Sequence, residues 1–443
     1  MSWFALIFKA YLTFMHEALM IRHRYTLGKD RLPAKGEKYF IVCNHQNCAN
    51  DPLNIMFALP LGTRIGAMAR ANVFSVSRPI TAFLRWIGLV PAFRMGWEGA
   101  AGLEHNFQSF DMVAESVNMH RPFIIFPEAG HTQGHYLGRF TTGAVRAAFH
   151  VAKSNGWRED IKIVPAAHHY EDYFKIRTDF LLQFSEPISL QPYYERFQQH
   201  PNSVMREITH ILHDRIQQMM LDEGEDDYAE KDFLRCSALN PASHHPSPTT
   251  HHLPPLPERL QHDKAFISSL CSNPRYADII SMARKLKGME DDAGTDDITI
   301  HRNRGTLAIF LRELLLMVLS PVWIATLFPH AICYTLPLRL LHEDKMFTNS
   351  YRYILNVLGL YPLFAVLSLV IGGAVLGWWW QTVLWLLLWI PAARFCWWYY
   401  QSFVSVRHAV LWAQLPSVTK AEILTLRKQI KDIIKDNEIQ VRK

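Results

Sequence analysis

The chain has 443 residues, a formal net charge of +6, and hydrophobic side chains at 49% of its positions. This length allows more than one folded unit. The charge is too small and too dispersed for a dedicated nucleic-acid binder, so we expect no nucleic-acid partner. It suits a protein that rests on anionic membrane lipids.

Residues 2–22 have the pattern of an amphipathic helix, with aromatic and aliphatic side chains at helical spacing from Trp3 to Met15. Two interpretations stay open: a helix packed on the folded domain, or one lying in the membrane interface. The stretch lacks the basic start and cleavage site of a secretory signal peptide. We therefore take 1–37 as an amphipathic N-terminal helical segment.

Residues 38–190 alternate short apolar runs with helical stretches, which indicates an α/β domain with helices on a sheet. Strands are predicted at Tyr39–Cys43, Arg64–Met68, Phe123–Phe126, Ile161–Pro165 and Phe180–Phe184. Helices are predicted at Ala71–Trp86, Phe107–Asn118, Thr142–Lys153 and 201–222. The resulting domain covers 38–222, and its polar motifs follow strand ends, where open α/β sheets usually carry their chemistry.

Residues 223–305 are predicted to be a linker followed by a helical segment. Cys236–Pro257 is rich in Pro, Ser, Thr and His and predicts a loop, whereas 258–287 has helical character. The acidic stretch Glu290–Asp297 predicts a solvated loop.

Residues 306–400 form the most apolar part of the chain. Val357–Gly377 and Trp380–Trp398 are each close to bilayer-spanning length. Glycines and tryptophans lie where the two would join, which predicts a membrane hairpin with an aromatic belt. Leu314–Leu336 is also apolar, but prolines and a histidine interrupt it. It could be a third span, a re-entrant segment or an interfacial helix.

The charges beside these segments favour one topology. The tail 401–443 is basic, as is the loop that contains Arg302 and Arg304, and both should be cytoplasmic by the positive-inside rule. An even number of crossings follows, so we favour one hairpin with Leu314–Leu336 embedded but not spanning. We expect an integral membrane protein whose N-terminal domain faces the cytoplasm, with its six cysteines reduced.

His45 and Asp51 directly follow the predicted strand Tyr39–Cys43. A histidine can take a proton from a hydroxyl near neutral pH. A carboxylate on its other ring nitrogen fixes the tautomer and stabilises the imidazolium. Asp51 also precedes Pro52, as expected of a helix N-cap. Taken alone, the pair fits an N-cap and an ordinary turn histidine equally well.

Three further motifs follow or end strand-like runs. Gly88–Arg94 ends in an arginine whose guanidinium suits a phosphate. At the next strand exit, Glu128 could bind substrate hydroxyls or hold Arg94, and Gly130 would let backbone N–H groups approach a phosphate. Ile163–Ala167 ends the last of these strands. Each motif also fits an ordinary surface residue or strand-exit turn.

Together the blocks NHxxxxxD, GxxPxxR, FPExG and VPA resemble those of the PlsC-like glycerophospholipid acyltransferase superfamily over residues 38–190. The five residues between His45 and Asp51 are similar to the glycerol-3-phosphate and dihydroxyacetone-phosphate acyltransferase-like branch. The resemblance implies a mixed α/β sheet flanked by helices. It also implies transfer of a fatty acyl group, from acyl-CoA or acyl carrier protein, to a hydroxyl of glycerol 3-phosphate or 1-acylglycerol 3-phosphate. No further cofactor is implied.

The same resemblance implies a role for each motif residue. His45 would be the general base and Asp51 its orienting carboxylate. Arg94 would contact the acceptor phosphate, while Glu128 and Gly130 would help to shape the acceptor site.

The third block departs from the family pattern. Ala129 stands where the family usually has Gly, and His131 and Thr132 replace the more usual Ser/Thr-Arg or Ser-His. Arg139 or Arg146 is therefore a further candidate phosphate ligand.

Two other functions remain open. Cys48 could be a nucleophile paired with His45, as in a thioesterase or lysophospholipase, although the domain lacks a GxSxG elbow. The altered third block also fits a catalytically inactive lipid-binding membrane protein. No metal is expected, because no Cys or carboxylate pattern accompanies the histidine pairs of the linker. These are His244, His245, His251 and His252.

Overall fold

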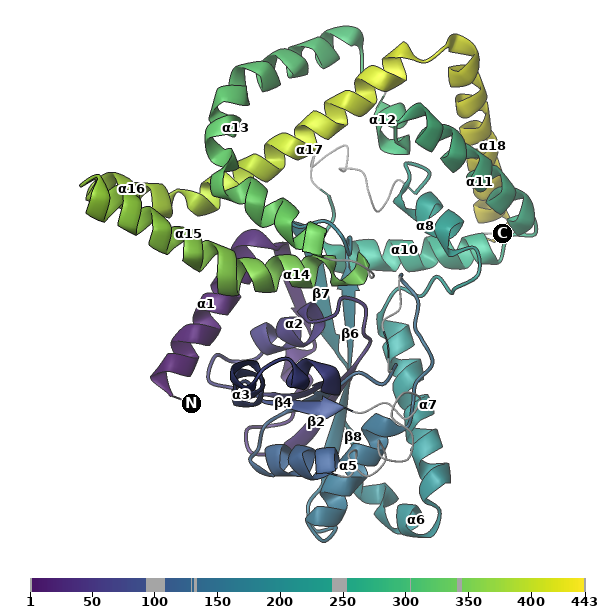
Figure 1. Ribbon diagram of the computed structural model, residues 1–443. Coiled ribbons are helices and arrows are strands. Elements are labelled where there is room, and N and C mark those ends of the chain that lie inside the picture. The colour runs from purple at the N-terminus through teal and green to yellow at the C-terminus, as the bar shows by residue number, and fades with distance from the viewer. Residues whose placement is uncertain are drawn as a thin grey trace. The chain divides into compact units, whose positions relative to one another are not determined.

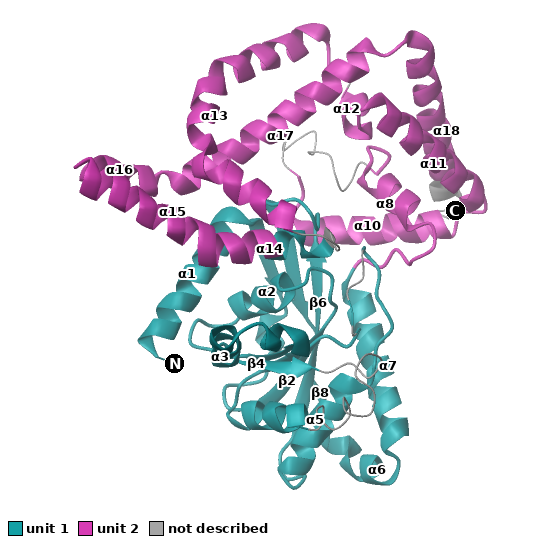
Figure 2. Ribbon diagram, viewed as in Figure 1, with its two compact units in different colours: residues 1–220, 344–350 teal, residues 221–343, 351–443 magenta. Residues whose placement is uncertain are grey.

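The computed structural model (Figure 1) describes residues 2–92, 108–128, 130, 134–240, 253–302, 304–340 and 345–441. The chain divides into two compact units (Figure 2): Met1–Met220 with Asp344–Ser350, and Leu221–Glu343 with Tyr351–Lys443. The first unit contains the predicted α/β domain together with the N-terminal helix.

An eight-stranded sheet lies at the centre of the first unit, in the order β1-β7-β6-β2-β5-β3-β4 with β8 beside β6. Its strands are β1 (Ile21–Leu27), β2 (Lys38–Cys43), β3 (Gly66–Arg70), β4 (Leu89–Ala92), β5 (Phe123–Ile125), β6 (Ile161–Tyr170), β7 (Thr178–Phe184) and β8 (Ile188–Ser189). β2 is parallel to β5 and β6, whereas β6 is antiparallel to β7 and β8. The predicted mixed α/β sheet flanked by helices is confirmed.

All five predicted strands form, and their apolar runs explain why. Residues 40–43 of β2 are fully buried, as expected of a central strand covered on both faces. β6 continues past its predicted end at Pro165, because residues 166–170 pair with β7. β1 was placed in the helical N-terminal segment, and that prediction is wrong. It lies at the edge of the sheet and carries polar residues such as Arg22 and Arg24, so it has no apolar run.

Helices cover both faces of this sheet. They are α1 (Trp3–Leu19), α2 (Asn50–Ala58), α3 (Arg78–Trp86), the helical residues 108–118, α5 (Gly143–Ser154), α6 (Tyr194–Gln199) and α7 (Pro201–Met219). The predicted helix Ala71–Trp86 is divided into a 3₁₀ turn, Ala71–Ser75, and α3. The division falls at Ser77, whose side chain accepts the Ile80 N–H and caps α3.

The described part of the second unit is helical. Its helices are α8 (Tyr228–Cys236), α10 (Leu256–Cys271), α11 (Tyr276–Ala293), α12 (Asp297–Arg302), α13 (Thr306–Leu340), α15 (Tyr361–Ser368), α16 (Trp379–Leu387), α17 (Trp389–Gln414) and α18 (Ser417–Val441). Helix α14 (Thr348–Leu355) begins in the first unit and continues into the second.

The predicted solvated loop at Glu290–Asp297 is wrong. Helix α11 runs through Glu290 to Ala293, and both Glu290 and Asp297 are buried. Asp297 is held by the guanidinium of Arg427 and accepts the Ala238 N–H at 2.6 Å. Acidic residues are normally solvated, but an ion pair with a cationic side chain offsets the cost of burying the carboxylate.

Two stretches are long and apolar enough to cross a membrane, judged by length and composition: Thr306–Leu340 and Thr348–Val375. The first includes the predicted embedded segment Leu314–Leu336, and its backbone leaves the helical conformation at Phe328. The second includes most of the predicted span Val357–Gly377.

The predicted return segment, Trp380–Trp398, is divided between α16 and α17 at Leu388. Helix α16 packs closely on the end of the preceding apolar stretch. A Cβ atom at Gly372 would lie 2.3 Å from Thr382 Oγ1, and one at Gly373 would lie 2.5 Å from the Trp379 ring. Glycine therefore permits the close approach that a tight helical hairpin needs.

Candidate active site

The candidate site lies at the carboxyl ends of parallel strands β2 and β5. The loop that follows β2 carries His45, and the one that follows β5 carries Glu128. One Glu128 carboxylate oxygen accepts the His45 N–H at 2.7 Å, and the other accepts the Gly138 N–H at 3.0 Å. Glu128 therefore ties the two loops together, and its predicted contact with substrate stays a prediction.

His45 and Asp51 are brought into direct contact. His45 Nδ1 lies 2.8 Å from Asp51 Oδ2. The Asp51 side chain is fully buried, and that of His45 is 17% exposed. The His45 ring stacks on Phe126, with 4.2 Å between ring centroids and 15° between planes. The imidazole is thus fixed on one edge by a carboxylate and on one face by an aromatic ring.

The turn between the two residues is closed by Asp51 itself. Its Oδ2 accepts the backbone N–H groups of Gln46 and Asn47, each at 2.8 Å. Helix α2 begins at Asn50 with Ala49 as its N-cap, so the predicted N-cap role of Asp51 is wrong. The carboxylate turns back to the loop instead of capping the helix.

Hydrogen bonds hold the charge of Asp51. Burial raises the pKa of its carboxyl group, but His168, His45 and the Tyr170 hydroxyl lower it, to about 2. Tyr170 donates to Oδ1 at 2.6 Å, and His168 Nδ1 lies 3.7 Å from the same oxygen. Burial lowers the pKa of His168, while the charge of Asp51 acts to raise it. An ionised Asp51 can only accept, so His45 Nδ1 bears the proton and Nε2 keeps the lone pair.

A buried network that sequence reasoning missed surrounds this pair. Asn44 Oδ1 accepts the His168 N–H at 2.7 Å, and Asn44 Nδ2 donates to His168 O at 3.1 Å. The Tyr173 hydroxyl donates to Gln46 Oε1 at 2.8 Å. Tyr170 and Tyr173 follow the last motif, Ile163–Ala167, by only a few residues. Their contacts with the first motif could not be predicted from that position.

Residues from the start of α14 also reach the loop. Ser350 Oγ donates to Asn47 O at 2.9 Å and accepts the Asn50 N–H at 3.1 Å. Asn349 Nδ2 donates to Tyr173 O at 2.7 Å. Both side chains are buried and belong to the first unit. Nothing in their local sequence indicated this contact.

The geometry of Cys48 does not favour a nucleophile. Burial raises the pKa of its thiol to about 12, so the thiolate is scarce at neutral pH. Its backbone adopts a φ of 46°, which places it in the tight turn before α2. These features fit a partly buried turn residue.

The remaining predicted residues are not brought to the site by any contact we can describe. Gly130 lies in a half-buried bend, and Arg139 and Arg146 have exposed side chains. Several predicted residues lie outside the described part of the chain: Arg94, Ala129, His131, Thr132 and the linker histidines His244, His245, His251 and His252.

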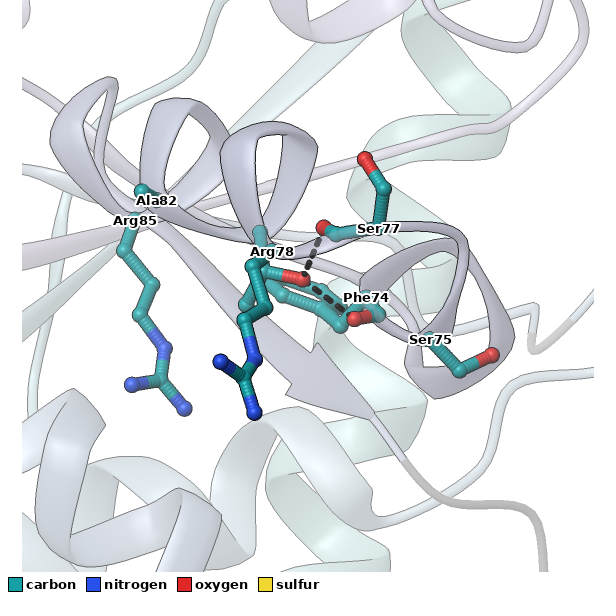
Figure 3. A pocket seen from close by; sticks show the side chains of 7 residues that line it. Phe74, Ser75, Ser77, Arg78, Ala82 and Arg85 are labelled. Atoms are coloured by element: carbon teal, nitrogen blue, oxygen red, sulfur yellow. Dashed lines mark hydrogen bonds between the residues drawn. The ribbon is translucent and has the colours of Figure 1, made fainter.

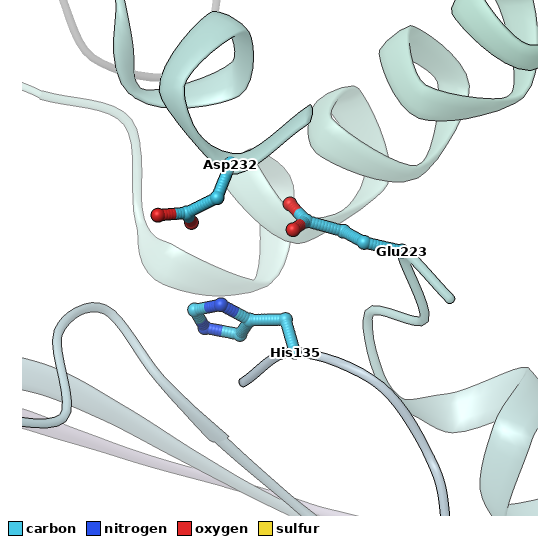
Figure 4. A group of neighbouring side chains, drawn as sticks. All are labelled: His135, Glu223 and Asp232. Carbon is cyan, nitrogen blue, oxygen red and sulfur yellow. The ribbon is translucent and has the colours of Figure 1, made fainter. Parts of the chain in front are cut away.

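Figure 4 draws His135 of the first unit and two acidic residues of the second, Glu223 and Asp232. Glu223 accepts from Arg235 Nε at 2.5 Å, and Asp232 binds the same buried guanidinium. His135 Nε2 lies 3.1 Å from Tyr170 O. Each side chain is bound within its own unit, and we assign no metal to them.

Residues 24–169 match the family described as Acyltransferase. This range contains β2 to β5, most of β1 and of β6, and both loops of the candidate site. Among solved structures, the chain is similar to the 1-acyl-sn-glycerophosphate (LPA) acyltransferase PlsC from Thermotoga maritima. The sequence identity is 14% and the TM-score 0.31, over 47% of this chain and 78% of that one. No curated protein matches the chain. The residues that match the Acyltransferase family all lie in the first unit.

Proposed function

We propose that the chain is a membrane-bound O-acyltransferase of phospholipid synthesis. It would move a fatty acyl group from acyl-CoA or acyl carrier protein to a hydroxyl of glycerol 3-phosphate or 1-acylglycerol 3-phosphate. One observation carries the proposal: a buried, ionised Asp51 orients His45 at the strand ends of a domain that matches the Acyltransferase family.

The mechanism uses His45 as a general base. Nε2 takes the proton of the acceptor hydroxyl as its oxygen attacks the carbonyl carbon of the thioester. Asp51 stabilises the imidazolium that results. The tetrahedral intermediate then collapses and breaks the carbon–sulfur bond. The thiolate leaves and takes the proton from Nε2, so the ester and the free thiol are the products and the imidazole is neutral again.

The choice of acceptor rests on the motif pattern. The five residues between His45 and Asp51 are similar to the glycerol-phosphate branch. In this proposal Arg94 binds the acceptor phosphate by its guanidinium, and Gly130 lies in the turn beside it. Glu128 acts beside them by holding the His45 loop in place.

Chain connectivity supports the proposed membrane topology. The first unit contains both 1–220 and 344–350, so the chain must return to the same side of the membrane by Ser350. Helix α13 lies between these parts and has 35 residues. Two crossings need about 40 residues, so an embedded α13 that does not span fits best. The segments that follow then form the spanning hairpin. The catalytic domain and the basic tail both lie on the cytoplasmic side of the membrane.

A panel of acceptors tests the activity. Purified full-length protein in nanodiscs is given acyl-CoA or acyl carrier protein with glycerol 3-phosphate, 1-acylglycerol 3-phosphate or a lysophosphatidylcholine. Mass spectrometry then identifies any new ester. We expect an ester of one of the first two acceptors. If no acceptor is acylated by either donor, the inactive lipid-binding alternative replaces this proposal.

Cys48→Ser separates the proposal from the thioesterase alternative. Transfer to the acceptor should be unchanged within about twofold, because the thiol takes no part in the mechanism. Loss of both transfer and thioester hydrolysis in a folded Cys48→Ser protein would support the covalent route instead.

A further inference from the structure

Helix α1 has two apolar faces, although a helix that only packs on a domain needs one. Its inner face is buried through Leu12, Met15 and Ala18. Its other face is largely exposed, at Trp3 (82%), Phe4 (69%), Ile7 (66%) and Phe14 (58%).

The helix is nevertheless fixed to the domain. Lys9, which is buried, donates from Nζ to Pro60 O at 2.9 Å and to Thr63 O at 3.3 Å. The exposed face of α1 is therefore part of the first unit and not of a loose N-terminal arm.

Helix α3 continues this exposed face. None of its residues, all of which the structure describes, is buried. Its apolar side chains include Ile80, Phe83 and Trp86, which are 36% to 44% exposed. The rings of the two helices meet, with 5.8 Å between Phe4 and Trp86 and 6.2 Å between Phe8 and Phe83. We call this set the aromatic surface: Trp3, Phe4, Ile7, Phe8, Ile80, Phe83 and Trp86.

The opposite side of α3 is cationic. Arg78 and Arg85 are seven residues apart and so share one face of the helix. Figure 3 shows both guanidinium groups pointing the same way, at an open pocket of about 460 Å³. The pocket is lined by Phe74, Ser75, Ser77, Arg78, Thr81, Ala82 and Arg85. Neither arginine forms an ion pair with a carboxylate that the structure describes.

We propose that α1 and α3 dock the first unit on an anionic phospholipid bilayer. The aromatic surface enters the boundary between headgroups and acyl chains, and Arg78 and Arg85 bind lipid phosphates. Two observations favour an anionic bilayer as the partner of this surface. A helix with an apolar face and arginines on the other face matches the depth profile of the membrane interface. Guanidinium groups beside serine and threonine hydroxyls match the charge and hydrogen-bonding capacity of a phosphate.

Hydrogen–deuterium exchange of the full-length protein tests the proposal. The protein is placed in nanodiscs of phosphatidylcholine, alone or with an equal part of phosphatidylglycerol. Exchange in the α3 peptide should slow in the anionic nanodiscs by about 30-fold, or about fivefold for each arginine. In the double variant Arg78→Gln/Arg85→Gln the difference should shrink to within about twofold. The matched pair Arg158→Gln/Arg206→Gln, exposed arginines of the same unit, should behave as wild type.

A second variant and a second readout keep the proposal open to refutation. Ile80→Gln/Phe83→Gln changes only exposed side chains and should speed α3 exchange in both kinds of nanodisc. Equal α3 exchange in detergent and in both nanodiscs would overturn the proposal. So would an arginine double variant that keeps its lipid dependence but raises the KM for acyl-CoA, because the pocket would then bind the acyl donor. Neither result bears on the His45 chemistry, so the proposed function stands or falls separately.

Discussion

Asp51 is a fully buried carboxylate that accepts four hydrogen bonds, from His45, the Gln46 and Asn47 backbones, and Tyr170. A carboxylate in this position costs free energy unless every partner is present. At the residue scale, the hydrogen bonds that hold the loop after β2 thus converge on the charge of Asp51. That charge also decides which nitrogen of His45 can act as a base.

The pH dependence of stability should report this charge. The pKa of Asp51 is about 2 in the folded protein, below its ordinary value of 3.8. The resulting stabilisation, roughly 2 kcal/mol, is fully present above pH 4 and is lost as the pH falls from about 4 to 2. Tyr170→Phe removes one donor, raises the folded pKa and should reduce the loss across that window. Chemical denaturation in detergent at each pH measures the free energy of unfolding. If Tyr170→Phe lost as much stability as the wild type over this pH range, Tyr170 would not stabilise the charge of Asp51.

Glu128→Gln should separate positioning from substrate contact. Glutamine offers one acceptor oxygen where two backbone N–H groups now meet a carboxylate. One partly buried N–H then loses its partner, at about 1 kcal/mol. We expect a lower Tm and a lower kcat with the KM for the acceptor within about twofold. A large rise in that KM at unchanged Tm would show that the carboxylate binds substrate instead.

The pair and its surroundings differ in how far sequence could predict them. His45 and Asp51 lie in one motif, so spacing alone suggested their contact. Tyr170 and Ser350 reach the same loop from 119 and 303 positions away in the chain. Only the pairing of β6 with β2 and the return of the chain at α14 bring them there. Local periodicity carries no information on such contacts.

At the scale of elements, the loop after β2 is held from three directions: by β6, by the loop after β5, and by the start of α14. The strands that position it were predicted because their apolar runs are long and buried. β1 was missed because its polar side chains suit an edge strand. The first turn of α14 is the least expected of the three, since it begins a long apolar stretch.

Ser350→Ala tests whether that first turn positions the loop. The substitution removes one of the two acceptors of the Asn50 N–H, which also donates to Asn47 O at 3.0 Å, and removes the hydroxyl donor to Asn47 O. We expect a loss of about 1 kcal/mol in stability and a fall in kcat, with Ser350→Thr restoring part of both. Ser320→Ala, which removes an exposed hydroxyl bonded within α13, is the matched control. If Ser350→Ala and Ser320→Ala changed stability and kcat equally, Ser350 would have no role in positioning the loop.

At the scale of the whole molecule, the chain forms two units, and the first is completed by a segment that follows α13. The sequence suggested an embedded α13 from its prolines and from flanking charge. Contacts of Asn349 and Ser350 now give an independent reason for the same topology. They could not be anticipated, because the return of the chain to the first unit is a tertiary feature.

Cysteine labelling of both ends of α13 tests this topology. Leu307 and Leu340 are exposed at its two ends. In a Cys271→Ser background, Leu307→Cys and Leu340→Cys should react with a membrane-impermeant maleimide from the same side of sealed vesicles. Val418→Cys, in the exposed start of α18, should react from that side too. Labelling of positions 307 and 340 from opposite sides would make α13 a span and refute the topology.

The most direct test of the central claim is the rate of acyl transfer by His45→Gln. Glutamine can keep a hydrogen bond to Asp51 but cannot take a proton from the acceptor. With an unchanged Tm and unchanged binding of the acyl donor, we expect kcat to fall by about 10³-fold. A folded His45→Gln protein that transfers the acyl group within tenfold of the wild-type rate would contradict the account.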